Sequence, residues 1–215
     1  MYSINKKDTI LITGATSGLG WNLSKYFADK GHPIVITGRN DIVLDEMEKY
    51  LPTDVYTICG DLRNTDVLLK IVRLSKENNV SVLVNNAGVV CPGLKIEDLS
   101  TDGITEMIDV NLKVPFLLTR MMYDNLADII NINSMVGIEP KKFRTAYTAS
   151  KWGLRGFTNS LRMESDKNIV EVYPTRIETY PGRKNSMNVD FVCEKIYNSY
   201  DSKLNDDLIL DGRLK

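Results

Sequence analysis

The sequence has few residues of the kinds that build metal centres and disulfide frameworks. It contains three cysteines and one histidine in 215 residues. Cys59, Cys91 and Cys193 are scattered and odd in number, so no disulfide framework is expected. No His/Cys/carboxylate cluster has the spacing of metal ligands. Cys59 falls in an apolar run and is expected to be a buried, inert thiol; His32, in a turn between a glycine and a proline, is expected to be structural.

Strong charge of one sign and long apolar runs are also missing. The formal net charge of −1 gives no reason to expect nucleic acid or an anionic membrane as a partner. No apolar stretch approaches the ~18 residues of a membrane span. The opening residues 1–7 lack the apolar core of a signal peptide. We therefore expect a cytoplasmic protein.

Apolar runs typical of buried strands alternate with helical patterns along the chain. Such an alternation predicts a parallel sheet with helices on both faces. No internal repeat or linker interrupts it, so we expect a single domain over residues 1–215, with an α/β, doubly wound parallel sheet (Rossmann fold) of about seven strands. The expected strands are 8–13, 33–37, 55–59, 80–84, 128–133, 168–173 and 207–211, and the expected helices are 18–30, 40–50, 63–77, 103–122, 147–164 and 188–200.

A glycine-rich turn joins the first strand to the first helix. The run Thr9–Ile12 leads into Thr13–Gly20, whose glycines are spaced G-x-x-x-G-x-G. Glycines permit a tight turn and let an anion approach the main chain, and the helix N-terminus offers unpaired N–H groups. The turn predicts a dinucleotide phosphate site, and the alternative is a turn that only packs helix against strand. The residues expected to line the site are Gly14, Thr16, Ser17, Gly18, Leu19 and Gly20.

Tyr147 and Lys151 lie four residues apart in the helical segment AYTASKWGL, which places both side chains on one helix face. A phenol has a pKa near ~10, too high for efficient proton transfer at neutral pH. An ammonium group one turn away favours the phenolate, so we expect Lys151 to lower the pKa of Tyr147. The pair then acts as an acid/base, although the same spacing also occurs in ordinary solvated helices.

These features, taken with three others in order, resemble the short-chain dehydrogenase/reductase family over nearly the whole chain. The turn matches the family's T-G-x-x-x-G-x-G cofactor motif, and Asn85–Gly88 reads N-N-A-G after an apolar strand. Asn111 falls at the family's catalytic-helix asparagine, and Ser134 stands at its catalytic serine, thirteen residues before Tyr147. The resemblance implies an oxidoreductase that transfers a hydride between a nicotinamide cofactor and a small carbonyl/alcohol substrate.

The resemblance also implies further cofactor contacts. After the sixth strand the family pattern is P-G-x-V/I-x-T, and Thr175 here replaces its glycine, which puts the backbone geometry in doubt. The implied contacts are Asp61 and Leu62 for the adenine ring, Asn86, Ala87 and Gly88 of the second motif, Pro174, Ile177 and Thr179 for the carboxamide, and Tyr147 and Lys151.

The end of the second strand bears on the choice of cofactor. An acidic residue there binds the ribose 2′-hydroxyl of NAD, whereas arginine accommodates the 2′-phosphate of NADP. Residues 36–40 contain Arg39 and no acid, and the following Asp41 is expected to cap the next helix. Against NADP, Ser17 occupies a position where many NADP enzymes of the family carry a second basic residue. NADP is therefore favoured, with NAD as the alternative.

The implied catalytic roles follow from the chemistry. Tyr147 gives the carbonyl oxygen a proton or takes it back, and Ser134 hydrogen-bonds the same oxygen. Lys151 lowers the tyrosine pKa and binds the nicotinamide ribose, while Asn111 holds a water that relays protons to the lysine. As alternatives, Ser134 is a strand-end cap and Asn111 satisfies a neighbouring backbone group.

Two other functions remain open. A non-catalytic nucleotide-sensing relative would keep the fold, but the presence of Ser134, Tyr147 and Lys151 together argues against it. A sugar-nucleotide epimerase or dehydratase normally has G-x-x-G-x-x-G spacing and a longer C-terminal substrate domain, and neither is found.

The expected substrate loop, residues 180–187, is short. A short loop implies an open pocket or one completed by a neighbouring subunit. Arg183 and Lys184 hint at an anionic substrate, although basic loop residues are usually just solvated, and Arg176 faces either substrate or solvent.

The segment Gly103–Met122 is apolar on more than one helix face. A surface helix needs one apolar stripe for its own sheet, so the surplus predicts a partner. In similar proteins this helix and the one carrying Tyr147 pair across a two-fold axis, and we expect a homodimer. A homotetramer would use 188–200 and 207–211 as a second surface. The alternative is that Pro115 kinks the helix and the surplus fills the home core.

Overall fold

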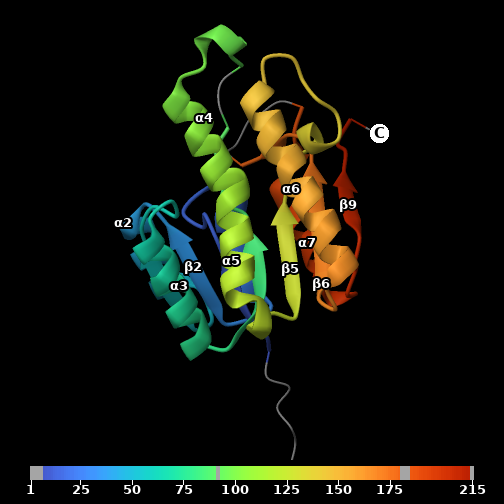
Figure 1. Ribbon diagram of the computed structural model, residues 1–215. Coiled ribbons are helices and arrows are strands. Elements are labelled where there is room, and N and C mark those ends of the chain that lie inside the picture. Colours follow the sequence, from blue (N-terminus) through green and yellow to red (C-terminus); the bar gives the residue numbers. More distant parts are fainter. Residues whose placement is uncertain (1–6, 91–92, 180–184, 214–215) are drawn as a thin grey trace, which may run out of the picture.

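The computed structural model describes residues 7–90, 93–179 and 185–213 (Figure 1). Strands and helices alternate as the sequence predicts up to the sixth strand, after which two short strands that the sequence did not predict precede the last helix. The strands are β1 (Thr9–Ile12), β2 (Ile34–Gly38), β3 (Val55–Cys59), β4 (Val80–Asn85), β5 (Asp128–Ile132), β6 (Asn168–Pro174), β7 (Ile177–Glu178), β8 (Met187–Asn188) and β9 (Asp207–Leu210). The helices are α1 (Gly18–Asp29), α2 (Asp41–Tyr50), α3 (Thr65–Glu77), α4 (Thr101–Ile108), α5 (Val114–Met122), α6 (Thr145–Glu164) and α7 (Val189–Asp201), with a π-helical turn η2 (Asp109–Lys113) between α4 and α5.

One seven-stranded parallel sheet forms the centre of the domain, in the order β3-β2-β1-β4-β5-β6-β9. The strand order reverses between β1 and β4, which pair directly. In such sheets, ligands bind outside the carboxyl ends of the strands at the reversal point. The predicted single-domain, doubly wound fold is therefore confirmed, and the sheet directs attention to the ends of β1 and β4.

Helices cover both faces of this sheet, and each face has its own apolar core. Successive strand residues point to opposite faces, so Ile10 and Ile12 enter one core while Leu11 enters the other. The first core packs against α1, α2 and α7; the second packs against α3, α5 and α6. Figure 1 shows α3, α5 and α6 side by side in front of the sheet. His32 is buried in the first core, between Phe27 and Tyr200.

The structure corrects two local expectations. Cys59 is an exposed free thiol, because it ends β3, which lies at the edge of the sheet. Asn40, and not Asp41, caps α2: its side chain accepts a hydrogen bond from the Val43 N–H group at 3.2 Å.

The expected helix over 103–122 is continuous in direction but is interrupted by η2. Pro115 lies in the first turn of α5, which follows η2 directly, and it has no N–H group to donate to the carbonyl oxygen of Asn111 four residues earlier. The irregularity falls on residues 109–113, just before the proline, and includes Asn111. Single π-turns within helices often occur at functional sites.

Candidate active site

Two glycines shape the turn between β1 and α1. Gly14 has a φ of +67°, and a Cβ atom on it would lie 2.8 Å from the Cα atom of Ala87. A Cβ atom on Gly20 would collide with the Gly14 carbonyl oxygen and the Asn86 amide nitrogen. The turn is therefore a cradle that any larger side chain would fill or distort.

The second motif holds this cradle in place. The Thr13 hydroxyl oxygen accepts hydrogen bonds from the N–H groups of Asn86 and Ala87, each at 3.0 Å. In return, the Asn86 side-chain amide donates to the carbonyl oxygens of Thr13 at 2.8 Å and Gly14 at 3.2 Å. These bonds tie the end of β1 to the end of β4, so the two motifs form one unit.

A cavity of about 290 Å³ opens over this unit. At its edge, the Ser17 side chain makes no capping hydrogen bond to α1, and the first turn of α1 has no acidic residue. The uncapped helix N-terminus is a favourable place for an anion. Of the predicted cofactor residues, the cavity is lined by Gly14, Thr16, Ser17, Gly18, Leu19, Gly20, Arg39, Asp61, Leu62, Asn86, Ala87 and Gly88.

Charged side chains surround the far end of this cavity. Arg39 lines it with a largely exposed side chain, and its Nη1 atom lies 4.0 Å from the Glu106 Oε1 atom. Asp61 also lines it, and its carboxylate accepts hydrogen bonds from the Arg63 guanidinium at 2.6–3.1 Å. These bonds hold the pKa of Asp61 below its usual value. Glu106 comes from α4 and was not singled out from the sequence.

A second cavity, of about 400 Å³, adjoins the first, since Leu19 and Asn86 line both. Ser134 and Tyr147 both lie in its wall. The predicted residues Pro174, Ile177 and Thr179 line it as well. The substitution of Thr175 for the family's glycine thus leaves the neighbouring matched residues at the cavity.

The protonation of Tyr147 differs from the sequence-based expectation. Burial raises the pKa of Tyr147, and the opposing influences come from the hydrogen bond with Ser134 and the charge of Arg144. The expectation that Lys151 lowers this pKa is wrong here, because the lysine points elsewhere. Its Nζ atom donates a hydrogen bond to the Ile132 carbonyl oxygen at 2.8 Å.

Lys151 lies beneath the cavities, with only 4% of its surface exposed. Burial lowers its pKa to about 8, against the negative charge of Glu171, which raises it. A Cβ atom on Gly88 would lie 4.0 Å from the Lys151 Nζ atom, so the ammonium group reaches the end of the second motif. The lysine therefore stands where β4, β5 and α6 meet.

Asn111 projects from η2 and is buried. Its Oδ1 atom accepts a hydrogen bond from the Val89 N–H group at 2.8 Å, and its Nδ2 atom donates to the Val89 carbonyl oxygen at 2.9 Å and to the Ser150 hydroxyl at 3.1 Å. The two bonds to Val89 match the alternative expectation that Asn111 satisfies a neighbouring backbone group. The water-relay role of Asn111 stays a prediction.

Sequence reasoning missed two buried polar residues behind the site. Asn133 precedes Ser134, and its Nδ2 atom donates to the Lys151 carbonyl oxygen at 3.0 Å. Glu171 lies in the middle of β6 and is fully buried. The available signal was a carboxylate inside the apolar run NIVEVYP, because a buried charge needs partners.

Three basic residues, Lys141, Arg144 and Arg176, also line the second cavity. Arg176 thus borders the predicted substrate space while remaining exposed. Arg183, Lys184 and most of the expected substrate loop 180–187 lie outside the described residues.

No helix in residues 7–90, 93–179 and 185–213 is long and apolar enough to cross a membrane. Over the same ranges, no three His, Cys, Asp or Glu residues are grouped so that they could hold a metal ion.

Comparison with known proteins places this geometry in a family. Residues 8–188 match the family described as short chain dehydrogenase. The 3-oxoacyl-(acyl-carrier-protein) reductase FabG of Rickettsia prowazekii is 37% identical over 162 residues, which cover 73% of this chain and 66% of that protein.

Solved structures show the same fold. An alcohol dehydrogenase from the archaeon Thermococcus sibiricus, complexed with 5-hydroxy-NADP, has a TM-score of 0.88 at 20% identity, covering 97% of this chain and 98% of that one. A 4-hydroxyisoleucine dehydrogenase complexed with NADH has a TM-score of 0.83 at 25% identity, covering 96% and 98%. The chain belongs to the short-chain dehydrogenase/reductase family and is an NAD(P)-dependent oxidoreductase.

Proposed function

We propose that this enzyme uses NADP to interconvert a carbonyl compound and its alcohol, with Ser134, Tyr147 and Lys151 as the residues that orient substrate and move the proton. One observation carries the proposal. Ser134 and Tyr147 lie together in the wall of a cavity that adjoins the glycine cradle.

The first cavity fits a dinucleotide. Its floor is main chain brought close by Gly14 and Gly20, and the uncapped N-terminus of α1 faces an anion favourably. When bound, the nicotinamide supplies or accepts the hydride. The residues proposed to hold the cofactor are the first-cavity residues named above, with Tyr147, Lys151, Pro174, Ile177 and Thr179 at the nicotinamide end.

Each catalytic side chain then has a distinct task. The raised pKa of Tyr147 keeps its phenol protonated at neutral pH, so it is ready to donate a proton to a carbonyl oxygen. Ser134 hydrogen-bonds that oxygen and holds it in line. Lys151 supplies a positive charge beneath the site and binds the ribose. Asn111 bonds to the Val89 main chain and holds a water that relays protons to the lysine.

Arg39 supports NADP as the cofactor. Its guanidinium lines the first cavity, where it offers planar donors to a 2′-phosphate. Glu106, 4.0 Å away, opposes this preference because it is an alternative partner for the same guanidinium.

The walls of the second cavity favour an anionic carbonyl substrate. Lys141, Arg144 and Arg176 bring three positive charges to the cavity that holds Ser134 and Tyr147, and none of the residues lining it within the described chain is acidic. A carboxylate or phosphate on the substrate would be attracted there.

The face formed by α5 and α6 supports the proposed homodimer. Phe116 of α5 is 51% exposed and packs edge-on against Phe157 of α6, with ring centroids 4.8 Å apart. Other apolar residues of the α4–α5 segment, including Met107, Val114 and Leu118, fill the home core. The surplus expected from the sequence is thus smaller than predicted, and Phe116 is its most exposed residue. Other apolar residues of the segment are partly exposed, among them Ile104, Ile108, Val110, Leu112 and Leu117. The homotetramer and the cytoplasmic location stay predictions.

Turnover assays test the proposed reaction. Oxidation of NADPH and of NADH is followed in the presence of a library of carbonyl compounds, with Tyr147→Phe as the inactive control. Turnover with NADPH that is lost in Tyr147→Phe is expected. Cofactor binding without turnover of any compound would contradict the proposal and favour a nucleotide-sensing protein.

A further inference from the structure

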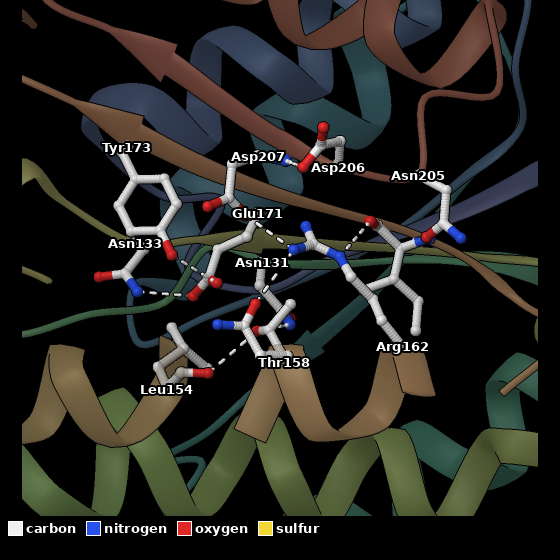
Figure 2. A network of polar contacts seen from close by, with 12 residues as sticks. Asn131, Asn133, Leu154, Thr158, Arg162, Glu171, Tyr173, Asn205, Asp206 and Asp207 are labelled. Atoms are coloured by element: carbon white, nitrogen blue, oxygen red, sulfur yellow. Dashed lines mark hydrogen bonds and ion pairs between the residues drawn. The ribbon is translucent and has the colours of Figure 1, made fainter. Parts of the chain in front are cut away.

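A buried carboxylate lies behind the catalytic residues, and the mechanism above does not use it. Glu171 of β6 has no exposed surface. Its Oε1 atom accepts a hydrogen bond from the Asn133 Nδ2 atom at 2.6 Å, and its Oε2 atom accepts one from the Tyr173 hydroxyl at 2.7 Å (Figure 2). Burying a carboxylate costs free energy unless it is paired, so we expect the burial of Glu171 to serve a purpose.

Asn133 connects this carboxylate to the active site. Its Oδ1 atom accepts a hydrogen bond from the Ser134 N–H group at 2.8 Å, which fixes the orientation of the amide, because a backbone N–H can only donate. Its Nδ2 atom donates both to Glu171 and to the Lys151 carbonyl oxygen. One side chain therefore ties Glu171 to the main chain of Ser134 on one side and of Lys151 on the other.

The hydrogen bonds also indicate the charge of Glu171. Since the Asn133 amide nitrogen can only donate, Oε1 is an acceptor, and the Tyr173 hydroxyl donates to the other oxygen. Burial raises the pKa of Glu171 above its usual value, and the hydrogen bonds from Tyr173 and Asn133 offset part of this rise. A carboxylate that receives two donors is stabilised in its ionised form.

Other charged groups surround the carboxylate. Arg162 of α6 and Asp207 of β9 form an ion pair of 2.7 Å and act on Glu171 with opposite signs. Arg155 of α6 acts on Tyr173. Lys151 is also positively charged, and the charge of Glu171 raises its pKa against the effect of burial. The Arg162–Asp207 pair is balanced by itself, which leaves Glu171 to offset Lys151.

We propose that Glu171 is a positioning residue for the reaction: through Asn133 it fixes the main chain at Ser134 and Lys151, and its buried charge keeps Lys151 an ammonium ion. The role of Glu171 in catalysis rests on the proposed function. The charge pairing of Glu171 with Lys151 does not depend on that function, so it is tested by unfolding, without an activity assay.

A double-mutant cycle in the cofactor-free protein measures the pairing. Glu171→Gln keeps the shape of the side chain and removes its charge, and Lys151→Met removes the partner. Urea unfolding of the wild type, both single variants and the double variant is compared from about pH 7 to about pH 9.

The expected pH dependence follows from the pKa of Lys151, which is about 8. Without Glu171 this pKa falls further, so between the lower pKa of the variant and about 8 the folded wild type holds more protons than folded Glu171→Gln. As pH rises across that interval the wild type therefore loses stability relative to the variant, and the deficit in urea midpoint caused by Glu171→Gln shrinks by about half or more. In the Lys151→Met background the deficit should not change with pH.

The pairing would be overturned if the loss of urea midpoint caused by Glu171→Gln did not change with pH in the protein that keeps Lys151. It would also be overturned if that loss changed equally with pH in the protein that keeps Lys151 and in Lys151→Met. If Glu171→Gln alone does not fold, the double variant decides: folding restored by Lys151→Met supports the proposal, and failure in both backgrounds overturns it. Asp128→Asn is the matched control, because Asp128 is a buried carboxylate at the opposite end of β5 that pairs with Lys203, and its loss should leave the pH dependence of the wild type unchanged.

Two kinetic measurements connect the pairing to the reaction. In Glu171→Gln, the alkaline limb of carbonyl reduction should move to lower pH by about half a unit or more. Glu171→Asp keeps the charge but withdraws the oxygen from Asn133, so it should lower kcat about tenfold with KM for the cofactor little changed. An unmoved limb or an unchanged kcat, in an enzyme whose turnover still depends on Tyr147, would overturn the inference and leave the proposed function standing.

Discussion

The two cavities meet at one edge of the sheet, yet one is walled mainly by main chain and the other by side chains. The cavity over the β1–α1 turn is walled by main chain that glycines bring close, and its charged groups stand near solvent: the Arg39 side chain is 70% exposed. The catalytic cavity rests on buried polar side chains, among them Lys151 at 4% exposure and Glu171 at 0%. Changes in the first should therefore act on cofactor affinity, and changes in the second on rate and its pH dependence.

The buried polar side chains behind the catalytic cavity continue away from the site. The Asn85 amide donates to the Asn131 Oδ1 atom at 2.9 Å. The Asn131 amide donates to the Thr158 hydroxyl at 2.9 Å (Figure 2). The Thr158 hydroxyl in turn donates to the Leu154 carbonyl oxygen at 3.0 Å. These bonds join β4, β5 and α6, so the helix that carries Tyr147 and Lys151 is held to the sheet by directional contacts as well as by apolar packing.

Removing the proposed acid should produce the largest effect. Tyr147→Phe should lower kcat by ~10² to 10⁴, because a positioned proton donor is lost. Cofactor affinity should stay within a few-fold of the wild type. Tyr50→Phe is the matched control, since Tyr50 is 81% exposed on α2. A Tyr147→Phe enzyme with more than about a tenth of the wild-type kcat would refute the assignment.

A change in the first cavity should alter affinity instead. Arg39→Leu should weaken NADPH binding by about ten- to hundredfold and leave NADH nearly unchanged, because one charge-assisted phosphate contact contributes about 1.5–3 kcal/mol. Glu106→Gln should act in the opposite direction and tighten NADPH binding slightly, since it frees the guanidinium. Fluorescence titration measures both, and equal losses for the two cofactors would contradict the choice of NADP.

The glycine cradle offers a comparison with a matched glycine outside it. Gly20→Ala forces a methyl group onto the Gly14 carbonyl and the Asn86 amide, and should destabilise the fold by about 1–3 kcal/mol while weakening the cofactor site. Gly156→Ala, in α6, meets nothing within 4 Å and should stabilise by about 0.5–1 kcal/mol. Thermal unfolding with and without NADPH tests the pair; similar shifts for both would show that the cradle is not tightly packed.

The proposed dimer face should respond to a polar substitution. Phe116→Ser should shift the protein toward the monomer mass of 24.3 kDa in light scattering at micromolar concentration. Ile42→Ser, at an exposed apolar residue of α2, should have no effect on mass. A monomer mass for the wild-type protein in the same measurement would contradict the proposed homodimer.

The smallest expected effect concerns the substrate. Arg176→Ala should raise KM for an anionic carbonyl substrate by about two- to fivefold, the size expected for one exposed charge, and leave a neutral ester of the same compound unaffected. Arg73→Ala, on the exposed surface of α3, serves as the control. A KM that rises equally for the acid and the ester would argue against an anionic substrate.

The sequence by itself determined the order of strands and helices and the place of the glycine turn. These are local properties: apolar runs such as residues 80–84 mark buried strands, and the spacing of Gly14, Gly18 and Gly20 marks a tight turn wherever the chain folds. Because the strands are parallel, local patterns were also enough to place the turn and the N-N-A-G motif at the same edge.

Only the tertiary structure decided the exposure of Cys59, the elevated pKa of Tyr147 and the partners of Lys151. The pairing of Glu171 with Asn133 joins residues 38 positions apart, and the Lys151 ammonium binds a carbonyl 19 positions away. A pKa depends on burial and on the charges that come close in space. A helical spacing of four residues shows that Tyr147 and Lys151 share a face, but it does not show where the lysine points, because that is set by the strands packed beneath it.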